Sequence, residues 1–117
     1  EIESLKIKLE NLMSEEKPFL EPALTLNDLA KIMGVNSAVL SRTINLGFEK
    51  NFNDFVNEFR IDEVKKKLAH DDAKNMTLLG IAFECGFNSK ATFNRAFKKF
   101  TGVSPKEYQT DSSLKSV

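Results

Sequence analysis

The sequence is poor in the residues that build covalent or metal-bound frameworks. Its 117 residues include one cysteine, one histidine, three prolines and no tryptophan. The lone Cys85 has no partner for an internal disulfide, which suits a reducing compartment. One cysteine and one histidine cannot supply a metal-ligand set, and we find no nucleophile–base pair or phosphate-binding glycine loop. We therefore expect no enzymatic activity, no metal and no cofactor.

Long hydrophobic runs are also missing. No apolar stretch approaches the roughly 20 residues that cross a bilayer, and no signal-peptide pattern opens the chain. The first residue is not methionine and falls inside an expected helix, so we expect the chain to be a piece of a longer protein.

The net charge of the chain is zero, but its charged residues are unevenly distributed along the sequence. Lysine and arginine total 17, as do aspartate and glutamate. Residues 1–30 carry seven acidic and three basic side chains, whereas residues 31–117 carry ten acidic and fourteen basic ones. Residues 31–48 contain no acid, and residues 85–106 contain five bases and no acid. A polyanionic partner requires this kind of local bias rather than a basic total.

Hydrophobic residues make up 41% of the chain and include ten phenylalanines, which indicates an aromatic-rich core. Their spacing is helical and the alternation typical of strands is absent, so we predict an all-α fold of about seven helices. The expected helices cover about 2–17, 25–33, 37–46, 51–70, 77–84, 89–100 and 104–109. The expected inner faces of the second and third are Leu26, Leu29, Ala30, Ile32 and Met33, then Val39, Leu40 and Ile44. Residues 47–50 are expected to form a turn.

Helix-capping residues stand at most of these boundaries. Thr25 with Asp28 forms a near capping box, while Thr77, Ser89 and Ser104 precede later helices. Two boundaries leave alternatives: the third helix is capped by Asn36 or Ser37, and the long central one by Asn51 or Asn53. Three glycines, Gly34, Gly86 and Gly102, are expected in turns.

A nine-residue pattern occurs twice. Leu29-Ala30-x-x-x-Gly34-Val35-Asn36-Ser37 returns 52 residues later as Ile81-Ala82-x-x-x-Gly86-Phe87-Asn88-Ser89. Each copy predicts a helix, a glycine turn, a polar cap and a second helix that contains an arginine, either Arg42 or Arg95. This is the pattern of a helix-turn-helix. Two copies in one small chain favour two reading heads on duplex DNA.

Several stretches together carry a family resemblance. They are Leu24-Thr25-Leu26-x-x-Leu29-Ala30, Leu40-Ser41-Arg42-x-Ile44-Asn45, Asn51-Phe52-x-Asp54-Phe55-Val56-Asn57-x-Phe59-Arg60-Ile61, Ile81-Ala82-x-x-x-Gly86-Phe87-Asn88-Ser89-x-x-x-Phe93-x-Arg95-Ala96-Phe97-Lys98-Lys99 and Gly102-x-Ser104-Pro105-x-x-Tyr108. Over about residues 5–109, their order and spacing resemble the DNA-binding domain of AraC-type bacterial transcription regulators. The resemblance implies two helix-turn-helix subdomains joined by a long central helix. It also implies that each places a recognition helix in one of two successive major grooves, about 34 Å apart.

On that reading the chain divides into five segments. They are an N-terminal helix or linker stub packing on the first subdomain (1–17), the first helix-turn-helix subdomain (18–50), the central linker helix (51–70), the second helix-turn-helix subdomain (71–109) and a flexible tail (110–117). The central helix, of roughly 18 residues, would span about 27 Å.

The first recognition helix is expected to expose Ser37, Ala38, Ser41, Arg42 and Asn45. Arginine can read guanine through paired hydrogen bonds, and asparagine can read adenine in the same way. A surface salt bridge to Glu49 is the alternative for Arg42. The resembled family often has a larger polar or aromatic residue where Ala38 stands, and alanine offers only apolar contact.

The second recognition helix is expected to expose Lys90, Ala91, Asn94, Arg95, Lys98 and Lys99, opposite a buried face of Phe93, Ala96, Phe97 and Phe100. Lys90 lies in the first turn, near where base edges are met. Arg95 could read a base or pair with a phosphate, and the last two lysines suit phosphates. A solvated basic face is the alternative. Thr77 could offer its hydroxyl and nearby amides to a phosphate, although helix capping explains it equally well.

The function expected from these features is sequence-specific binding of double-stranded DNA to regulate transcription, with activation as the family habit. The alternative is a protein-interaction bundle that has lost DNA binding. The implied partners are DNA, RNA polymerase and an N-terminal sensor or dimerisation domain outside this chain, with no small-molecule ligand. We expect a cytoplasmic location, and a weaker resemblance to modules of membrane-bound sensors leaves a membrane anchor open for the parent protein.

Overall fold

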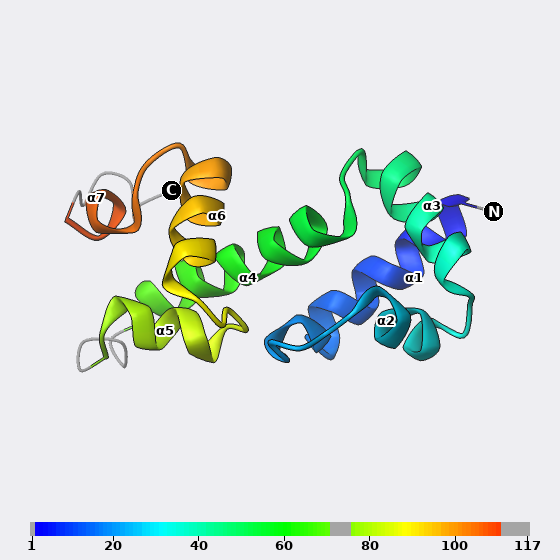
Figure 1. Ribbon diagram of the computed structural model, residues 1–117, viewed down its shortest axis with the longest axis horizontal. Coiled ribbons are helices and arrows are strands. Elements are labelled where there is room, and N and C mark those ends of the chain that lie inside the picture. Colours follow the sequence, from blue (N-terminus) through cyan, green and yellow to red (C-terminus); the bar gives the residue numbers. More distant parts are fainter. Residues whose placement is uncertain (1, 71–75, 111–117) are drawn as a thin grey trace. The chain divides into compact units, whose positions relative to one another are not determined.

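The computed structural model describes residues 2–70 and 76–110, and every regular element in these ranges is helical (Figure 1). The elements are α1 (Ile2–Glu15), the 3₁₀ turn η1 (Pro18–Leu20), α2 (Leu26–Met33), α3 (Ser37–Phe48), α4 (Phe52–Leu68), α5 (Leu78–Glu84), α6 (Lys90–Thr101) and α7 (Pro105–Thr110). Within the described residues, the predicted all-α class and the expectation of about seven helices are confirmed.

The chain forms two compact units, residues 1–57 and residues 58–117, which we call the first and second unit. Helix α4 begins in the first unit and continues into the second. Residues 71–75, which follow the expected central helix, and residues 111–117 of the predicted tail lie outside the described residues. Thr110, expected to begin that tail, is instead the last residue of α7.

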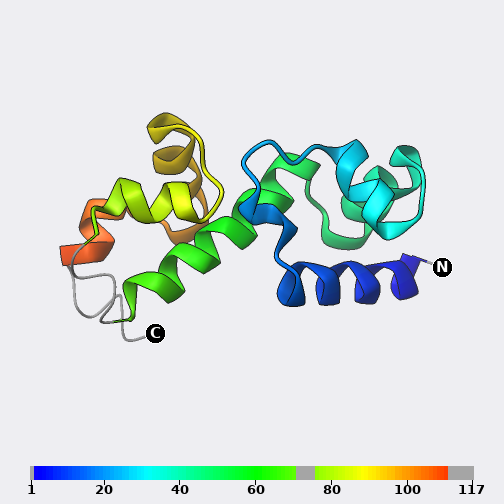
Figure 2. The same cartoon turned by 90° about the horizontal axis from the view of Figure 1, so that it is seen from below.

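In the first unit, α1 packs against η1 and α3, and α3 packs against α2 (Figure 2). Leu9 and Met13 of α1 are fully buried, as the helical spacing of the sequence indicates. The turn η1 was not expected, and it buries Phe19 to 3% exposure. The remaining core residues of this unit are Leu29, Ala30, Met33, Leu40, Ile44, Phe55 and Val56.

The prediction of a turn at residues 47–50 is wrong at its start, because α3 continues through Gly47 to Phe48. The reason is a contact with α1 that local sequence does not reveal. A Cβ on Gly47 would lie 2.7 Å from both Cγ and Cδ of Lys6, so the glycine lets the two helices approach closely. The Phe48 ring centroid lies 4.8 Å from that of Phe55 and 5.2 Å from the Lys6 ammonium. These contacts stabilise the last turn of α3, and Glu49 then ends it with φ +57°.

Two residues placed in the core by the sequence are exposed. Ile32 is 51% exposed and Val39 is 37% exposed, whereas Thr43, which was not expected inside, is 2% exposed. The buried residues of α3 are Leu40, Thr43 and Ile44, so its inner face points in the predicted direction but is narrower, with Val39 just outside its edge and Thr43 within it. Thr43 tolerates burial because its hydroxyl donates to the Val39 carbonyl oxygen at 2.8 Å.

The second unit has a core of its own built around aromatic rings. Successive ring centroids are 5.3 Å apart for Phe87–Phe93, 5.8 Å for Phe93–Phe97 and 5.3 Å for Phe97–Tyr108, all tilted or edge-on. The remaining buried members of this core are Ile61, Val64, Ile81, Ala82, Cys85 and Ala96. Arg60 of α4 is 9% exposed and places its guanidinium 6.0 Å from the centre of the Phe87 ring.

The predicted caps are confirmed, and both alternatives are resolved. The Thr25–Asp28 capping box is complete, with both hydrogen bonds at 3.1 Å, and Ser104 and Glu107 form an equivalent pair. Asn36 rather than Ser37 caps α3, and the Asn51 side chain accepts the Asp54 N–H of α4 at 2.8 Å. The turn glycines all have positive φ: +75° at Gly34, +106° at Gly86 and +85° at Gly102.

The aromatic core predicts a large stability difference between two phenylalanines of the second unit. Phe97 is fully buried, whereas Phe83 is 46% exposed. Phe97→Ala should lower the free energy of unfolding by about 3–5 kcal/mol, since it removes contacts and leaves a cavity. Phe83→Ala, the matched control, should cost about 1 kcal/mol or less. Urea denaturation followed by circular dichroism measures both, and equal losses would contradict the placement of Phe97.

The turn between α2 and α3 predicts that replacing Gly34 lowers stability because of the backbone conformation there, not because of crowding. A Cβ on Gly34 would meet nothing within 4 Å, but φ is +75°. Gly34→Ala should therefore destabilise the protein by about 1–2 kcal/mol. Gly34→Asn should lose less, because asparagine adopts this conformation more readily. If thermal unfolding showed the alanine variant to be as stable as the parent, this explanation of the turn would be wrong.

Candidate nucleic-acid interface

Helix α3 presents one polar face to solvent in the first unit. Ala38, Arg42 and Asn45 are exposed, whereas Ser37 and Ser41 are half-buried. The Ser37 hydroxyl donates to the side-chain oxygen of Asn27 in α2. The five predicted residues thus lie on the outer side of the helix, opposite Leu40, Thr43 and Ile44.

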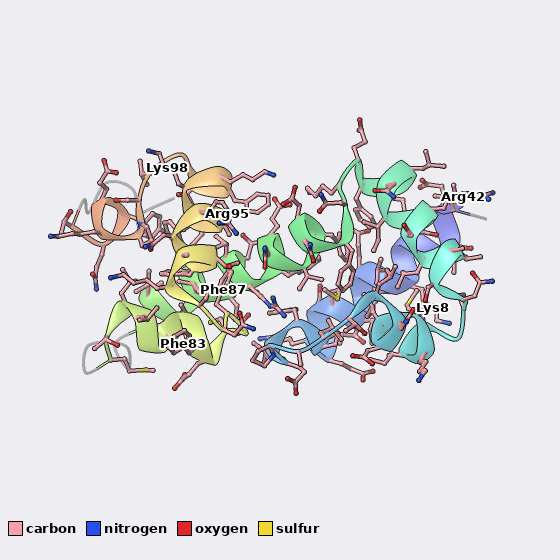
Figure 3. All side chains as sticks on the ribbon, in the orientation of Figure 1. Lys8, Arg42, Phe83, Phe87, Arg95 and Lys98 are labelled. Atoms are coloured by element: carbon pink, nitrogen blue, oxygen red, sulfur yellow. The ribbon has the colours of Figure 1, made fainter. Side chains whose placement is uncertain are left out.

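The side chains of Ser41, Arg42 and Asn45 could form hydrogen bonds to a molecule bound at this face of α3. Asn45 donates to the Ser41 hydroxyl at 3.3 Å, a long bond that an incoming acceptor could replace. Within residues 2–70 and 76–110, Arg42 forms no ion pair, so the alternative salt bridge to Glu49 is not present. Figure 3 shows Arg42 on the outer side of α3. A guanidinium in this position can donate to a base edge or a phosphate.

Helix α6 presents a larger and more basic face in the second unit. Its six predicted residues are all exposed: Lys90, Ala91, Asn94, Arg95, Lys98 and Lys99. Phe93, Ala96 and Phe97 are buried beneath them, and Phe100 is half-buried rather than fully buried. Ser89 caps the helix by accepting the Thr92 N–H at 3.1 Å. The sequence therefore identified the outer face of α6 correctly.

The basic side chains of α6 have few acidic neighbours. Among the described residues, Lys90, Arg95 and Lys98 form no ion pairs. The pKa of the Glu107 carboxyl in α7 is lowered, first by the backbone N–H of Ser104, then by its hydroxyl and more weakly by Lys98. That carboxylate is therefore ionised at neutral pH and tied to the start of α7. The Lys99 ammonium lies 5.9 Å from the centre of the Phe100 ring.

The two threonine caps differ in a way that concerns Thr77. Both hydroxyls accept a backbone N–H, from Asp28 at 3.1 Å for Thr25 and from Gly80 at 2.9 Å for Thr77. In the first unit the Asp28 carboxylate also occupies the Thr25 N–H. The corresponding position in the second unit is Gly80, which has no side chain. The exposed Thr77 thus has no counterpart of the Asp28 carboxylate at the third position of its helix.

One basic residue near α6 was missed by the sequence reasoning. Lys106 of α7 lines an open cavity of about 380 Å³ together with Lys90, Asn94 and Lys98 of α6. It belongs to the acid-free window at residues 85–106, which was the available signal. In the described part of the chain, no group of three or more potential ligand residues is placed to hold a metal ion. None of the described helices is long and apolar enough to span a membrane.

Comparison with known proteins gives a match that extends over parts of both units. A family model described as a helix-turn-helix domain matches residues 29–111. An uncharacterized HTH-type transcriptional regulator of Staphylococcus aureus (strain COL) is 35% identical over 88 residues, which is 75% of this chain and 11% of that protein. The chain therefore spans about a ninth of the length of that relative.

Two solved structures have the same fold. The C-terminal domain of AraT, a response regulator from Geobacillus stearothermophilus, is 25% identical with a TM-score of 0.69, covering 92% of this chain and 82% of that one. A Chromobacterium violaceum transcriptional regulator described as containing an AraC-type DNA-binding domain is 20% identical with a TM-score of 0.72, covering 91% of this chain and 95% of that one. Since the family model covers most of the chain and contains both copies of the repeat, the chain belongs to the AraC-type helix-turn-helix family of DNA-binding transcription regulators.

Proposed function

We propose that α3 and α6 are recognition helices that enter successive major grooves of one DNA duplex and read its sequence. The observation that carries the proposal is that each repeat copy buries one face of its second helix and leaves the other polar and free of acids. Major grooves on one face of B-DNA recur about every 34 Å, so two heads on one chain can share a single site.

In this proposal, α3 of the first unit and α6 of the second unit contribute unequally to DNA affinity. Helix α6 carries Lys90, Arg95, Lys98 and Lys99, whereas α3 carries Arg42 as its one basic residue. Each lysine or arginine that neutralises a phosphate releases counterions and adds to affinity without regard to sequence. The second unit therefore supplies most of the electrostatic attraction. The first unit adds base readout through Arg42 and Asn45.

The alanines restrict what each head can read. Ala38 and Ala91 are both exposed on the outer faces of their helices. A methyl side chain can contact a thymine methyl but cannot donate to a base edge. Sequence discrimination by the two helices therefore rests on Arg42, Asn45 and Arg95. The Thr77 hydroxyl and the amides beside it would add a phosphate contact from the second unit.

We further propose that this chain is part of a longer regulator. The 88 matched residues make up 11% of the relative of similar sequence, which supports a DNA-binding module within a larger regulator. Signal sensing or dimerisation would then belong to the remainder of that protein, and RNA polymerase would be the partner at the promoter. Such a module works in the cytoplasm, where bacterial DNA lies. We assign it no enzymatic activity.

Substituting the two arginines separately tests the unequal contribution. Against a duplex selected from a random library, Arg95→Ala should weaken binding by about 1–3 kcal/mol, the range for a lost base contact. Arg42→Ala should weaken binding less than Arg95→Ala, because the first unit has no further cations on its exposed helix face to hold it on the duplex. Fluorescence anisotropy at several salt concentrations measures both, and affinity should fall steeply with salt through counterion release.

Lys66 provides the control for these substitutions, because it is an exposed cation on α4 outside both recognition helices. Lys66→Ala should leave the affinity nearly unchanged. Binding that ignored both salt and Arg95→Ala would contradict the proposal. A protein-interaction bundle would behave differently again, giving no electrophoretic shift with genomic DNA at low salt.

A further inference from the structure

The cavity beside α6 has an unusual number of cationic side chains on its walls. Seven residues line its volume of about 380 Å³: Leu78, Lys90, Asn94, Lys98, Ser104, Pro105 and Lys106. Three of the seven are lysines, two from α6 and one from α7. Like charges that share a concave surface repel each other, and a bound anion would relieve that repulsion.

The cavity divides the exposed face of α6 into two rows. Lys90, Asn94 and Lys98 are four residues apart and therefore follow one edge of the helix into the cavity. The neighbouring row is made of Ala91, Arg95 and Lys99, and none of these lines the cavity. Figure 3 shows Arg95 and Lys98 on the same helix, one from each row. The two rows can thus meet different parts of a partner.

Hydrogen-bond donors dominate the polar lining. The lysine ammonium groups can only donate, and the Asn94 amide contributes two further N–H donors. The Ser104 hydroxyl accepts the Glu107 N–H at 3.1 Å and hydrogen-bonds to the Glu107 carboxylate, so the lysines and Asn94 supply the free donors of the cavity. A phosphate diester presents only acceptor oxygens and one negative charge, so it matches this lining. Glu107 is the nearby acid, and its carboxylate accepts the Ser104 N–H at 3.0 Å.

We propose that this cavity receives a backbone phosphate of the bound duplex, with Lys106 as a DNA-contacting residue supplied by α7. The inference rests on the proposed function and deepens it. Lys90, Asn94, Lys98 and Lys106 hold the sugar–phosphate backbone, while Ala91 and Arg95 face the bases. Backbone contacts of this kind set the register of a recognition helix but carry no sequence information. Helix α7 is then part of the DNA-binding surface.

The test is Lys106→Gln, measured by fluorescence anisotropy on a selected duplex and on an unrelated one. At about 0.1 M salt the variant should lose about fivefold to tenfold affinity for both, and the slope of log affinity against log salt should fall by about one. The ratio of the two affinities should stay the same. Arg95→Ala should instead lower that ratio, and Lys106→Arg should restore the parent slope.

Lys66→Gln is the matched control, since it removes an exposed lysine of the same unit that lies outside the cavity. It should change neither affinity nor slope. If the parent binds DNA and Lys106→Gln binds equally well, the inference is wrong while the proposed function stands. If the parent binds no duplex, the proposed function fails.

A further arm separates backbone phosphate from a free anion. Inorganic phosphate is titrated alone while the amide resonances of α6 and α7 are followed by NMR. Shifts that saturate below about 1 mM phosphate in the parent but vanish in Lys106→Gln, with duplex affinity unaltered by the variant, would assign the cavity to a free anion and overturn the inference. Absence of such saturation, together with the loss of duplex affinity, supports it.

Discussion

The burial of Phe97 between Phe93 and Tyr108 fixes the rotation of α6 about its axis, and the whole polar face of that helix depends on it. A helix of 12 residues cannot be held in one orientation by its own hydrogen bonds. Once Phe93, Phe97 and Ala96 are buried, Arg95 and the lysines of α6 lie on the exposed side of the helix. The hydrophobic core of the second unit thereby decides which side chains can reach a partner.

In the first unit, a different set of contacts fixes the orientation of α3. Helix α3 has a narrower buried face of Leu40, Thr43 and Ile44, and its last turn is held by the close approach of Gly47 to Lys6 of α1. Helix α1 therefore supports the first head directly, and the second head has α7 in a comparable supporting place against α6. Because α7 also brings Lys106 to the cavity, the same packing adds a cation to the face where α6 is already basic. The two copies of one sequence pattern therefore differ both in the basic residues of their second helices and in what packs beside them.

Local signals predicted most of the fold. The threonine, serine and asparagine caps, the three positive-φ glycines and the apolar spacing of α6 are each settled within a few residues of sequence, and the structure has them where expected. The errors at Val39, Ile32 and Gly47 have a common physical origin, because residues at the edge of a helix face are buried or exposed according to a neighbouring helix that periodicity does not specify. Lys106 was overlooked for the same reason: it is distant from the repeat in sequence, and packing of α7 on α6 brings it to the recognition helix.

The central claim is that the two outer faces of α3 and α6 read one duplex together. Selection of bound sequences from a random duplex library tests it most directly, because the result reports where and how far apart bases are recognised. The account predicts two conserved half-motifs in line, with centres about 10 base pairs apart, one helical turn of DNA. Enrichment of a single half-motif would contradict joint reading by the two heads, and no enrichment at all would contradict sequence-specific recognition.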